Sequence, residues 1–306
     1  MKRRDFLRSS SVAAAALAAS GMRGWAQAPA APAAPPVTTF TELRRGVGIF
    51  TASGGTIGYL VNGDGAVAVD SQYMNNAEIC VAGLKQRAPK GIAMLINTHH
   101  HADHTGGNRA FKGVQKIVAH EACAAWHRRT AEQAGTLAEQ SIADTTFSEA
   151  WKADFGDETI HARYFGAGHT SGDAVVTFEK ANVVHMGDLL FNRAHPNIDR
   201  PAGANIANWI RALEQASGTA SADTIFIAGH AKDLTVRTTK ADVAHFRDYL
   251  TAVMDFARKG RAAGKSKEEV QQTTTLAGFD DAIQLNARLT LGFVLGIAFD
   301  ELNERM

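Results

Sequence analysis

The hydrophobic positions of this chain fall into short runs that glycine, asparagine and aspartate separate, a pattern typical of β-strands joined by tight turns. The first three runs lie at 47–51, 57–61 and 66–69, with the hairpin signals Gly54-Gly55 and Asn62-Gly63-Asp64-Gly65 between them. Later apolar runs predict further strands at 92–96, 117–119, 159–164, 174–178, 183–186 and 224–228.

Helical stretches alternate with these strands, so the pattern predicts an α/β fold. Expected helices lie at 77–86, at 108–111 and from Glu121 onward. Apolar side chains at 206, 209, 210 and 213 would share one face of a further helix. The chain from Val236 to its end is helical in character, and its apolar run 293–299 is too short to span a bilayer. We expect that run to be a core helix.

The first 28 residues are expected to be a targeting signal. Lys2-Arg3-Arg4, followed by Phe-Leu, is similar to a Tat export signal, although Lys2 stands where Ser or Thr is usual. The mildly apolar stretch 9–19 is far shorter than the ~18–20 residues that a membrane anchor needs. Ala26-Gln27-Ala28 offers a cleavage site, with a cut after Ala30 as the alternative. We therefore expect a periplasmic or secreted protein with no stable membrane association once the signal is removed.

After the targeting signal, the chain is expected to consist of a linker and one domain. Residues 29–37, rich in proline and alanine, are expected to be an extended linker, and 38–306 to be one domain. The signal holds a surplus of four positive charges, so the net charge of +1 becomes about −3 without it. The sequence has no basic stripe of the kind that binds nucleic acid, so no nucleic-acid partner is expected.

Cys80 and Cys123 lack the spacing of metal ligands. We expect buried free thiols, with a disulfide as the alternative.

The densest chemistry lies in residues 98–107, Thr-His-His-His-Ala-Asp-His-Thr-Gly-Gly, directly after the predicted strand 92–96. A third of the twelve histidines of the chain are in this stretch. Imidazole and carboxylate groups are ligands for zinc and iron. A buried strand that ends in a loop of such side chains predicts a metal site.

Three more polar residues follow predicted strands, namely His169, Asp188 and His230. Each stands in a Gly-His or Gly-Asp pair, and a plain turn would explain any one of them alone. Because side chains that leave neighbouring strand ends can converge, their order after the histidine-rich stretch strengthens the metal-site interpretation.

The pattern His99-x-His101-x-Asp103-His104, followed by Gly-His-Thr, Gly-Asp and Gly-His, resembles the signature of the metallo-β-lactamase superfamily. This resemblance implies a four-layer αββα sandwich, here with extra helices at the C-terminus. Asp70, in Val-Asp-Ser, resembles the family's first motif, an acid that supports the metal-binding loop.

The same resemblance implies two zinc ions per chain, with iron or manganese as alternatives. One ion would be held by His99, His101 and His169, the other by Asp103, His104 and His230, and Asp188 would bridge them. A hydroxide between the metals would attack a small-molecule substrate, and Asp103 would orient it and pass on a proton. The implied activity is hydrolysis of an amide, lactone, ester or thioester.

Two departures narrow this expectation. Resistance-type β-lactamases of the superfamily carry Cys or Ser where this chain has Asp188, so penicillin cleavage is expected only as a weak side activity. Phe191 stands where quorum-quenching lactonases have Tyr. The alternatives are a mononuclear iron enzyme of the persulfide dioxygenase type and a metal-binding protein without turnover. The substrate and the oligomeric state stay open.

The other histidines are expected to be structural. His100 should point away from the metals, and His185 should lie in the core. His195 follows Asp188 on a loop; we expect a surface position, with a substrate contact as the alternative. Four more are interpreted as ordinary, namely His120, His127, His161 and His245.

Overall fold

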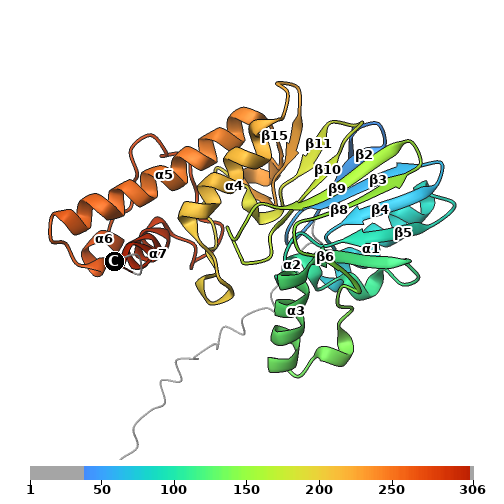
Figure 1. The fold of residues 1–306 in the computed structure, drawn as a ribbon, viewed down its shortest axis with the longest axis horizontal. Coiled ribbons are helices and arrows are strands. Elements are labelled where there is room, and N and C mark those ends of the chain that lie inside the picture. The colour runs from blue at the N-terminus through green and yellow to red at the C-terminus, as the bar shows by residue number, and fades with distance from the viewer. Residues whose placement is uncertain (1–37, 304–306) are drawn as a thin grey trace, which may run out of the picture. The chain divides into compact units, whose positions relative to one another are not determined.

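The computed structural model describes residues 38–303, so the predicted signal peptide (1–28) and linker (29–37) lie outside the described residues. Figure 1 shows two β-sheets with helices on their outer sides. Within the described residues, no helix is both long and apolar enough to cross a bilayer.

The first sheet has seven strands, which neighbour one another in chain order. The first four pair antiparallel through short turns, and the last four pair parallel because helices connect them. The strands are β1 (Thr39–Arg44), β2 (Val47–Thr51), β3 (Ile57–Asn62), β4 (Gly65–Val69), β5 (Ile92–Ile96), β6 (Lys116–His120) and β7 (Thr145–Phe147).

The second sheet has six strands in the order β15-β13-β11-β10-β9-β8. Its neighbours pair antiparallel except β11 and β13, which run parallel. The strands are β8 (Ala150–Phe155), β9 (Glu158–Tyr164), β10 (Ala174–Phe178), β11 (Val183–His185), β13 (Ile225–Ile227) and β15 (Arg237–Thr238). A separate parallel pair consists of β12 (Phe191–Asn192), shortly after Asp188, and β14 (His230–Ala231), which begins at His230.

Successive side chains of a strand point to opposite faces of its sheet, so one set packs between the two sheets and the other packs against the helices. In β4, Val67 and Val69 face the second sheet, where Ile160 and Phe178 meet them, whereas Ala68 faces helix α1 (Met74–Arg87). The outer face of the second sheet is covered by α4 (Ile206–Gly218) and α5 (Lys240–Ala262), and α7 (Leu291–Asn303) packs against α5. The remaining α-helices are α2 (Ala102–Thr105), α3 (Glu121–Gln133) and α6 (Lys267–Gln271). The predicted four-layer αββα sandwich with added C-terminal helices is confirmed.

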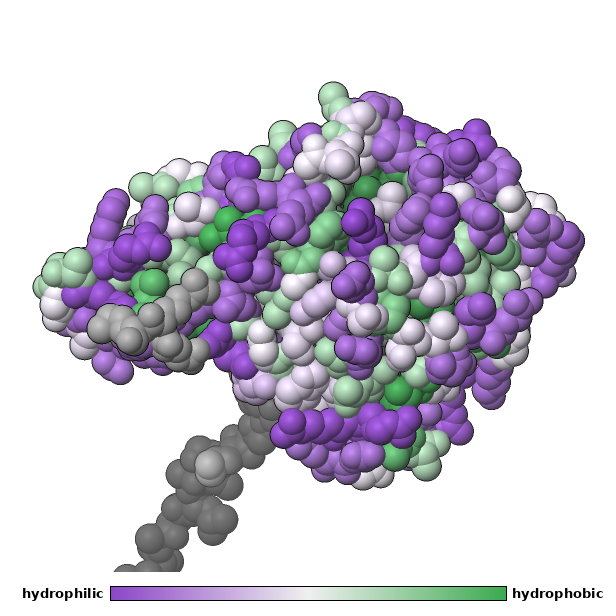
Figure 2. Space-filling model, viewed as in Figure 1, coloured by the Kyte–Doolittle hydropathy of each residue, from purple (hydrophilic) through white to green (hydrophobic). Residues whose placement is uncertain are grey.

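The packing also accounts for the smaller predictions. Cys80 and Cys123 are free and buried, as expected. The apolar run 293–299 lies in α7, a core helix as predicted. Figure 2 shows that purple, hydrophilic side chains cover much of the visible face, with apolar green ones in smaller patches.

The helical interpretation of the whole region after Val236 is wrong in two places. Residues 237–238 form β15, and 272–290 contain no α-helix. The run Thr273-Thr274-Thr275 and Gly278 are poor helix formers, and Ile283 forms a β-bridge with Ala194 instead.

Besides β15 and the two-residue strands β12 and β14, three strands have no counterpart in the sequence-based prediction, namely β1, β7 and β8. Each of these three lies at an edge of its sheet. Every second residue of β8 is exposed, so the strand lacks the apolar run that marks the central strands.

Candidate metal centre

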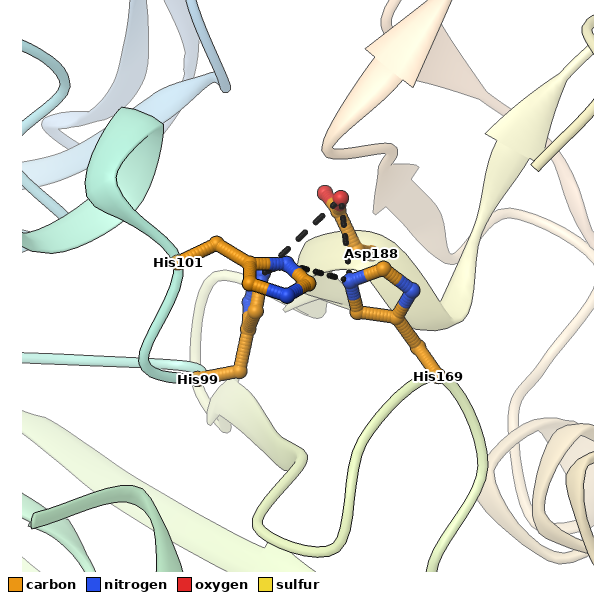
Figure 3. A group of neighbouring side chains, drawn as sticks. All are labelled: His99, His101, His169 and Asp188. Atoms are coloured by element: carbon orange, nitrogen blue, oxygen red, sulfur yellow. Dashed lines mark hydrogen bonds and ion pairs between the residues drawn. The ribbon is translucent and has the colours of Figure 1, made fainter. Parts of the chain in front are cut away.

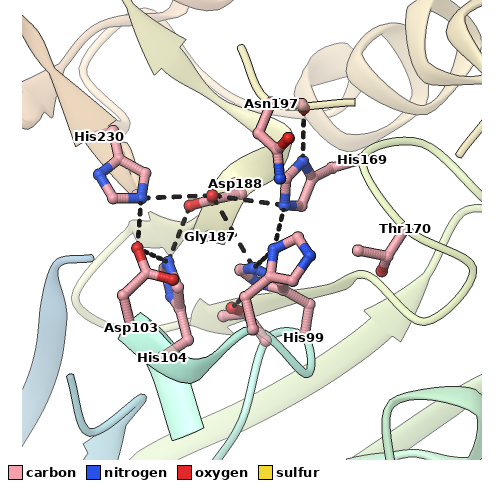
Figure 4. A network of polar contacts seen from close by, with 12 residues as sticks. His99, Asp103, His104, His169, Thr170, Gly187, Asp188, Asn197 and His230 are labelled. Carbon is pink, nitrogen blue, oxygen red and sulfur yellow. Dashed lines mark hydrogen bonds and ion pairs between the residues drawn. The ribbon is translucent and has the colours of Figure 1, made fainter. Parts of the chain in front are cut away.

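Short segments that follow four strands bring the predicted site residues together (Figure 4). The histidine-rich loop and α2 follow β5, and His169 lies between β9 and β10. Asp188 lies in a 3-10 turn after β11, and His230 begins β14 directly after β13. The first sheet therefore supplies four of the seven side chains, and the second sheet supplies the other three.

The first cluster contains His99, His101, His169 and Asp188, as Figure 3 shows. His101 Nδ1 lies 3.1 Å from His99 Nε2 and 2.9 Å from His169 Nε2. Asp188 Oδ2 lies 3.4 Å from His169 Nε2 and 3.8 Å from His99 Nε2. Three imidazole nitrogens and a carboxylate oxygen thus converge on one point, an arrangement that suits a tetrahedral metal ion.

The second cluster contains Asp103, His104 and His230. Asp103 Oδ2 lies 3.1 Å from His230 Nε2 and 3.8 Å from His104 Nε2. Asp188 reaches this cluster too, with its Oδ1 3.0 Å from His104 Nε2 and its Oδ2 3.3 Å from His230 Nε2. The Asp188 carboxylate therefore lies between the two clusters, which is the geometry of a bridging ligand.

Two observations show that these residues fit metal ions. Among the described residues, four buried side-chain atoms lack a hydrogen-bond partner, and two of them, His104 Nε2 and Asp188 Oδ1, face each other at 3.0 Å in this centre. Buried polar atoms without partners are rare and call for a missing ligand. A Cβ at Gly229 would come within 2.0 Å of Asp188 Oδ1, and one at Gly55 within 2.1 Å of the His104 ring. Only glycine leaves space for the ligands at these two positions.

Other polar groups turn the histidine rings toward the clusters. Asp70, whose φ of 65° is rare outside glycine, accepts from Thr98 N and Thr98 Oγ1, both at 2.7 Å, and lies 2.8 Å from His104 Nδ1. Asp199 Oδ2 lies 2.9 Å from His101 Nε2. A partner on the outer nitrogen fixes the tautomer and leaves the inner nitrogen free to bind a metal.

Burial disfavours the charged form of every side chain in the centre. Neighbouring side chains of opposite charge decide which groups are ionised nevertheless. Burial, followed by the neighbouring His104, holds the pKa of His99 well below its usual value. Burial alone would lower the pKa of His230, but the carboxylates of Asp188 and Asp103 raise it to about 9. Burial alone would raise the pKa of Asp103, but His104 and His230 lower it to about 2. Two ionised carboxylates therefore face the space between the rings, where cations are favoured.

Three of the histidines that were expected to lie outside the metal site, namely His100, His185 and His195, are buried. His185 lies in the core as predicted, with Nε2 3.1 Å from Thr56 O. His100 is buried next to Trp126, with Nε2 3.6 Å from Asp199 Oδ2, and belongs to neither of the two clusters. With His101 and Asp199 it forms a third group of side chains that lie close enough together to hold a metal ion. The surface position expected for His195 is wrong. It is buried, and its Nδ1 lies 2.8 Å from Tyr249 Oη, because α5 covers the loop.

Sequence reasoning missed the residues that shape the approach to the centre. A cleft of about 510 Å³ opens onto Asp103, Asp188 and His230. Its remaining lining comes from distant parts of the chain, including Tyr73, Asn197, Leu285, Arg288 and Leu289. No local pattern marks these positions. Asn197 alone belongs to a loop that the sequence had already placed beside Asp188.

Comparison with known proteins defines the class. Residues 51–230 match the family model of the metallo-beta-lactamase superfamily, and the chain belongs to this family. All seven predicted ligands lie inside the matched region. Membership agrees with the predicted fold and with the prediction of a metal-dependent hydrolase.

Several relatives show how far the likeness extends. The chain is 26% identical over 197 residues to a metallo-beta-lactamase type 2 from Bacillus sp. (strain 170), covering 64% of this chain and 73% of the relative. The structure of a metallo-beta-lactamase from Hirschia baltica is similar with a TM-score of 0.56 and 24% identity, covering 71% of this chain and 98% of that one. A stereoselective inverting sec-alkylsulfatase from Pseudomonas sp. has a TM-score of 0.68 at 13% identity, covering 86% of this chain and 50% of that one.

Proposed function

We propose that this protein is a dinuclear zinc hydrolase that cleaves an amide, lactone, ester or thioester bond of a small molecule. The observation that carries the proposal is the Asp188 carboxylate, which lies between two clusters of imidazole and carboxylate groups. Two bound divalent cations would lower the pKa of a water molecule and so supply a nucleophile at neutral pH.

The ligands divide between the two metals as follows. His99, His101 and His169 would hold one ion, Asp103, His104 and His230 the other, and Asp188 would bind both. Asp103 also lines the cleft, where its partly exposed carboxylate can accept a proton from the attacking water and pass it to the leaving group. Before metal binds, the neighbouring His104 and His230 lower the pKa of that carboxylate despite its burial; once both rings hold a metal, the cation itself would favour the ionised form. Iron or manganese in place of zinc would preserve these roles.

Two features favour a general hydrolase over narrower activities. The relatives named metallo-beta-lactamases support penicillin cleavage as a weak side activity, whereas the Asp188 carboxylate in place of Cys or Ser argues against it as the main one. Phe191 stacks on His230 with ring centroids 5.3 Å apart, so the phenol expected of a quorum-quenching lactonase is missing. The mononuclear iron alternative is less well supported, because the second cluster is complete.

Metal quantification, coupled to a hydrolase substrate panel, tests this proposal. The protein would be taken from the periplasm, since the Tat-like sequence of residues 1–28 supports export as part of the proposal. We expect two zinc ions per chain and turnover of at least one substrate class. One iron and no zinc per chain would contradict the hydrolase, and recovery from the cytoplasm alone would contradict export.

The substitution Asp188→Ala tests the bridge. Loss of an indirect partner of a metal typically costs about 10–100-fold, so loss of a direct ligand to both metals should cost more than about 100-fold in kcat/KM. Zinc content should fall below two per chain in the same preparation. Asp157→Ala, in an exposed turn between β8 and β9, is the control. Full activity and full zinc content in Asp188→Ala would rule out a bridging role.

A further inference from the structure

The cleft over the candidate metal centre has one wall that comes from outside the family domain. The family match ends at residue 230, yet Leu285, Asn286, Arg288 and Leu289 line the same cleft as Asp103, Asp188 and His230. The matched region supplies all the proposed metal ligands, and the later segment supplies none of them. This segment, residues 285–289, is therefore where the chain would set its own specificity.

The wall is anchored to the loop that follows Asp188. Ile283 N donates to Arg193 O at 3.0 Å, and His195 N donates to Ile283 O at 2.9 Å. Arg193 also forms an ion pair with Asp281 at 3.2 Å. Leu289 is buried at the other end of the segment. These contacts hold residues 285–289 against the cleft although the segment has no regular secondary structure.

Arg288 is tied to the centre through one residue. Its Nη2 donates to Asn197 Oδ1 at 2.9 Å, while the backbone oxygen of Asn197 lies 2.9 Å from His169 Nδ1. Figure 4 shows Asn197 beside His169 at the cluster. The same residue thus orients a proposed metal ligand and a guanidinium group.

Within residues 38–303, no carboxylate forms an ion pair with Arg288. Its guanidinium lies over the Phe293 ring, 5.4 Å from the centroid, which leaves the positive charge without a counterion there, and no other Lys or Arg lines the cleft. A guanidinium has a planar set of donors that suits a carboxylate. The rest of the lining is mixed: Phe191, Leu285 and Leu289 are apolar, whereas Ser53, Asn197 and Asn286 are polar. The cleft therefore suits a molecule with one negative end.

We propose that Arg288 binds a carboxylate group of the substrate, beside the bond that is hydrolysed at the metal centre. The substrate class is then a carboxylate-bearing ester, amide or thioester. This inference rests on the proposed hydrolase function for its turnover measurement, but not for its binding measurement.

The test compares two esters that differ only at one end, para-nitrophenyl hydrogen glutarate and its methyl ester, with release of para-nitrophenol as the readout. The zinc-loaded wild type should prefer the free carboxylate. Arg288→Gln should lower kcat/KM for that ester by about 10–100-fold, the usual range for a hydrogen bond to a charged group, and change the methyl ester less than about 2-fold. Arg288→Lys should retain part of the preference. Arg258→Gln, an exposed change on α5, should match the wild type.

A second measurement separates this inference from the proposed function. Calorimetry would give the affinity of glutarate itself for the zinc-loaded wild type and for Arg288→Gln, with zinc content measured in both. Arg288-dependent glutarate binding without turnover of either ester would support the inference and contradict ester hydrolysis. Equal losses for both esters, equal glutarate affinity in the two proteins, or no glutarate binding at all would overturn the role of Arg288.

Discussion

At the scale of single residues, the centre depends on which nitrogen each histidine turns inward. His104 presents Nε2 because Asp70 holds its Nδ1, and His101 presents Nδ1 because Asp199 holds its Nε2. His169 presents Nε2 while the Asn197 carbonyl oxygen holds its Nδ1. A neutral imidazole has one donor and one acceptor nitrogen, so each outer acceptor fixes the tautomer that can bind a metal.

Asp70→Asn should weaken the second metal selectively. The two carboxylate oxygens accept from Thr98 N, Thr98 Oγ1 and His104 Nδ1, and an amide cannot accept from all three, because one of its two ends only donates. We expect the affinity for the zinc ion at Asp103, His104 and His230 to fall by about 10–100-fold while the other ion stays bound. Titration of the metal-free protein against a chromophoric chelator measures both affinities.

The matched control for that change is Asp64→Asn, an exposed carboxylate that pairs with Lys90 at 2.8 Å. It should leave both affinities at their wild-type values. If Asp70→Asn also leaves both unchanged, then Asp70 does not orient His104 for metal binding.

At the scale of elements, the added C-terminal helices are joined to the family domain by a buried carboxylate. Glu301 on α7 accepts from Ile206 N at 2.7 Å and from Ala207 N at 3.1 Å, the first two backbone donors of α4. The first donors of a helix have no partner within the helix, and negative charge is favoured there. Because α4 also carries Trp209 against the outer face of the second sheet, α7 supports the helix layer beside the site.

Glu301→Gln should destabilise the protein without altering the metal centre. The substitution removes the charge and turns an amide NH₂ toward one of the two backbone donors. We expect the free energy of unfolding to fall by about 1–3 kcal/mol. Denaturant unfolding of the zinc-loaded protein measures this loss. Glu268→Gln, exposed on α6, should cost less than about 0.5 kcal/mol, and an equal loss in the two variants would refute the capping role.

At the scale of the whole molecule, the centre joins the two sheets. His99 to His104 follow a strand of the first sheet, whereas His169, Asp188 and His230 follow strands of the second. Metal ions bound here would link the two layers, and the unfolded chain would not reproduce the site. Metal binding should therefore stabilise the native state.

Removal of metal with a chelator should lower the melting temperature. At free zinc about 100 times the dissociation constant, binding contributes about 2.7 kcal/mol, which corresponds to roughly 5–10 °C for a domain of this size. Differential scanning calorimetry with and without zinc measures the shift. Asp188→Ala should show a smaller shift than the wild type. The same melting temperature in both conditions would contradict a metal site that spans the two sheets.

Much of the fold and of the candidate site is readable from local patterns. The central strands are apolar runs because both their faces are buried, and the proposed ligands stand out because they follow those runs directly. The edge strand β8 could not be predicted from an apolar run, because every second residue in it is exposed. The burial of His195 could not be predicted from a local pattern either, because a helix about fifty residues later, α5, covers the loop.

The sequence by itself predicted the seven proposed ligands, Asp188 among them as the proposed bridge, because they are marked by residue type and by position relative to a strand end. The αββα sandwich followed from the resemblance of that motif order to the family. Only the tertiary structure decided which groups surround these ligands. Asp199 lies 98 positions from His101, and Arg288 lies 91 positions from Asn197, yet each pair is 2.9 Å apart. Contacts over such separations depend on how whole elements pack. No local pattern encodes that packing, so the groups proposed to orient the ligands and to select the substrate appear only in the folded molecule.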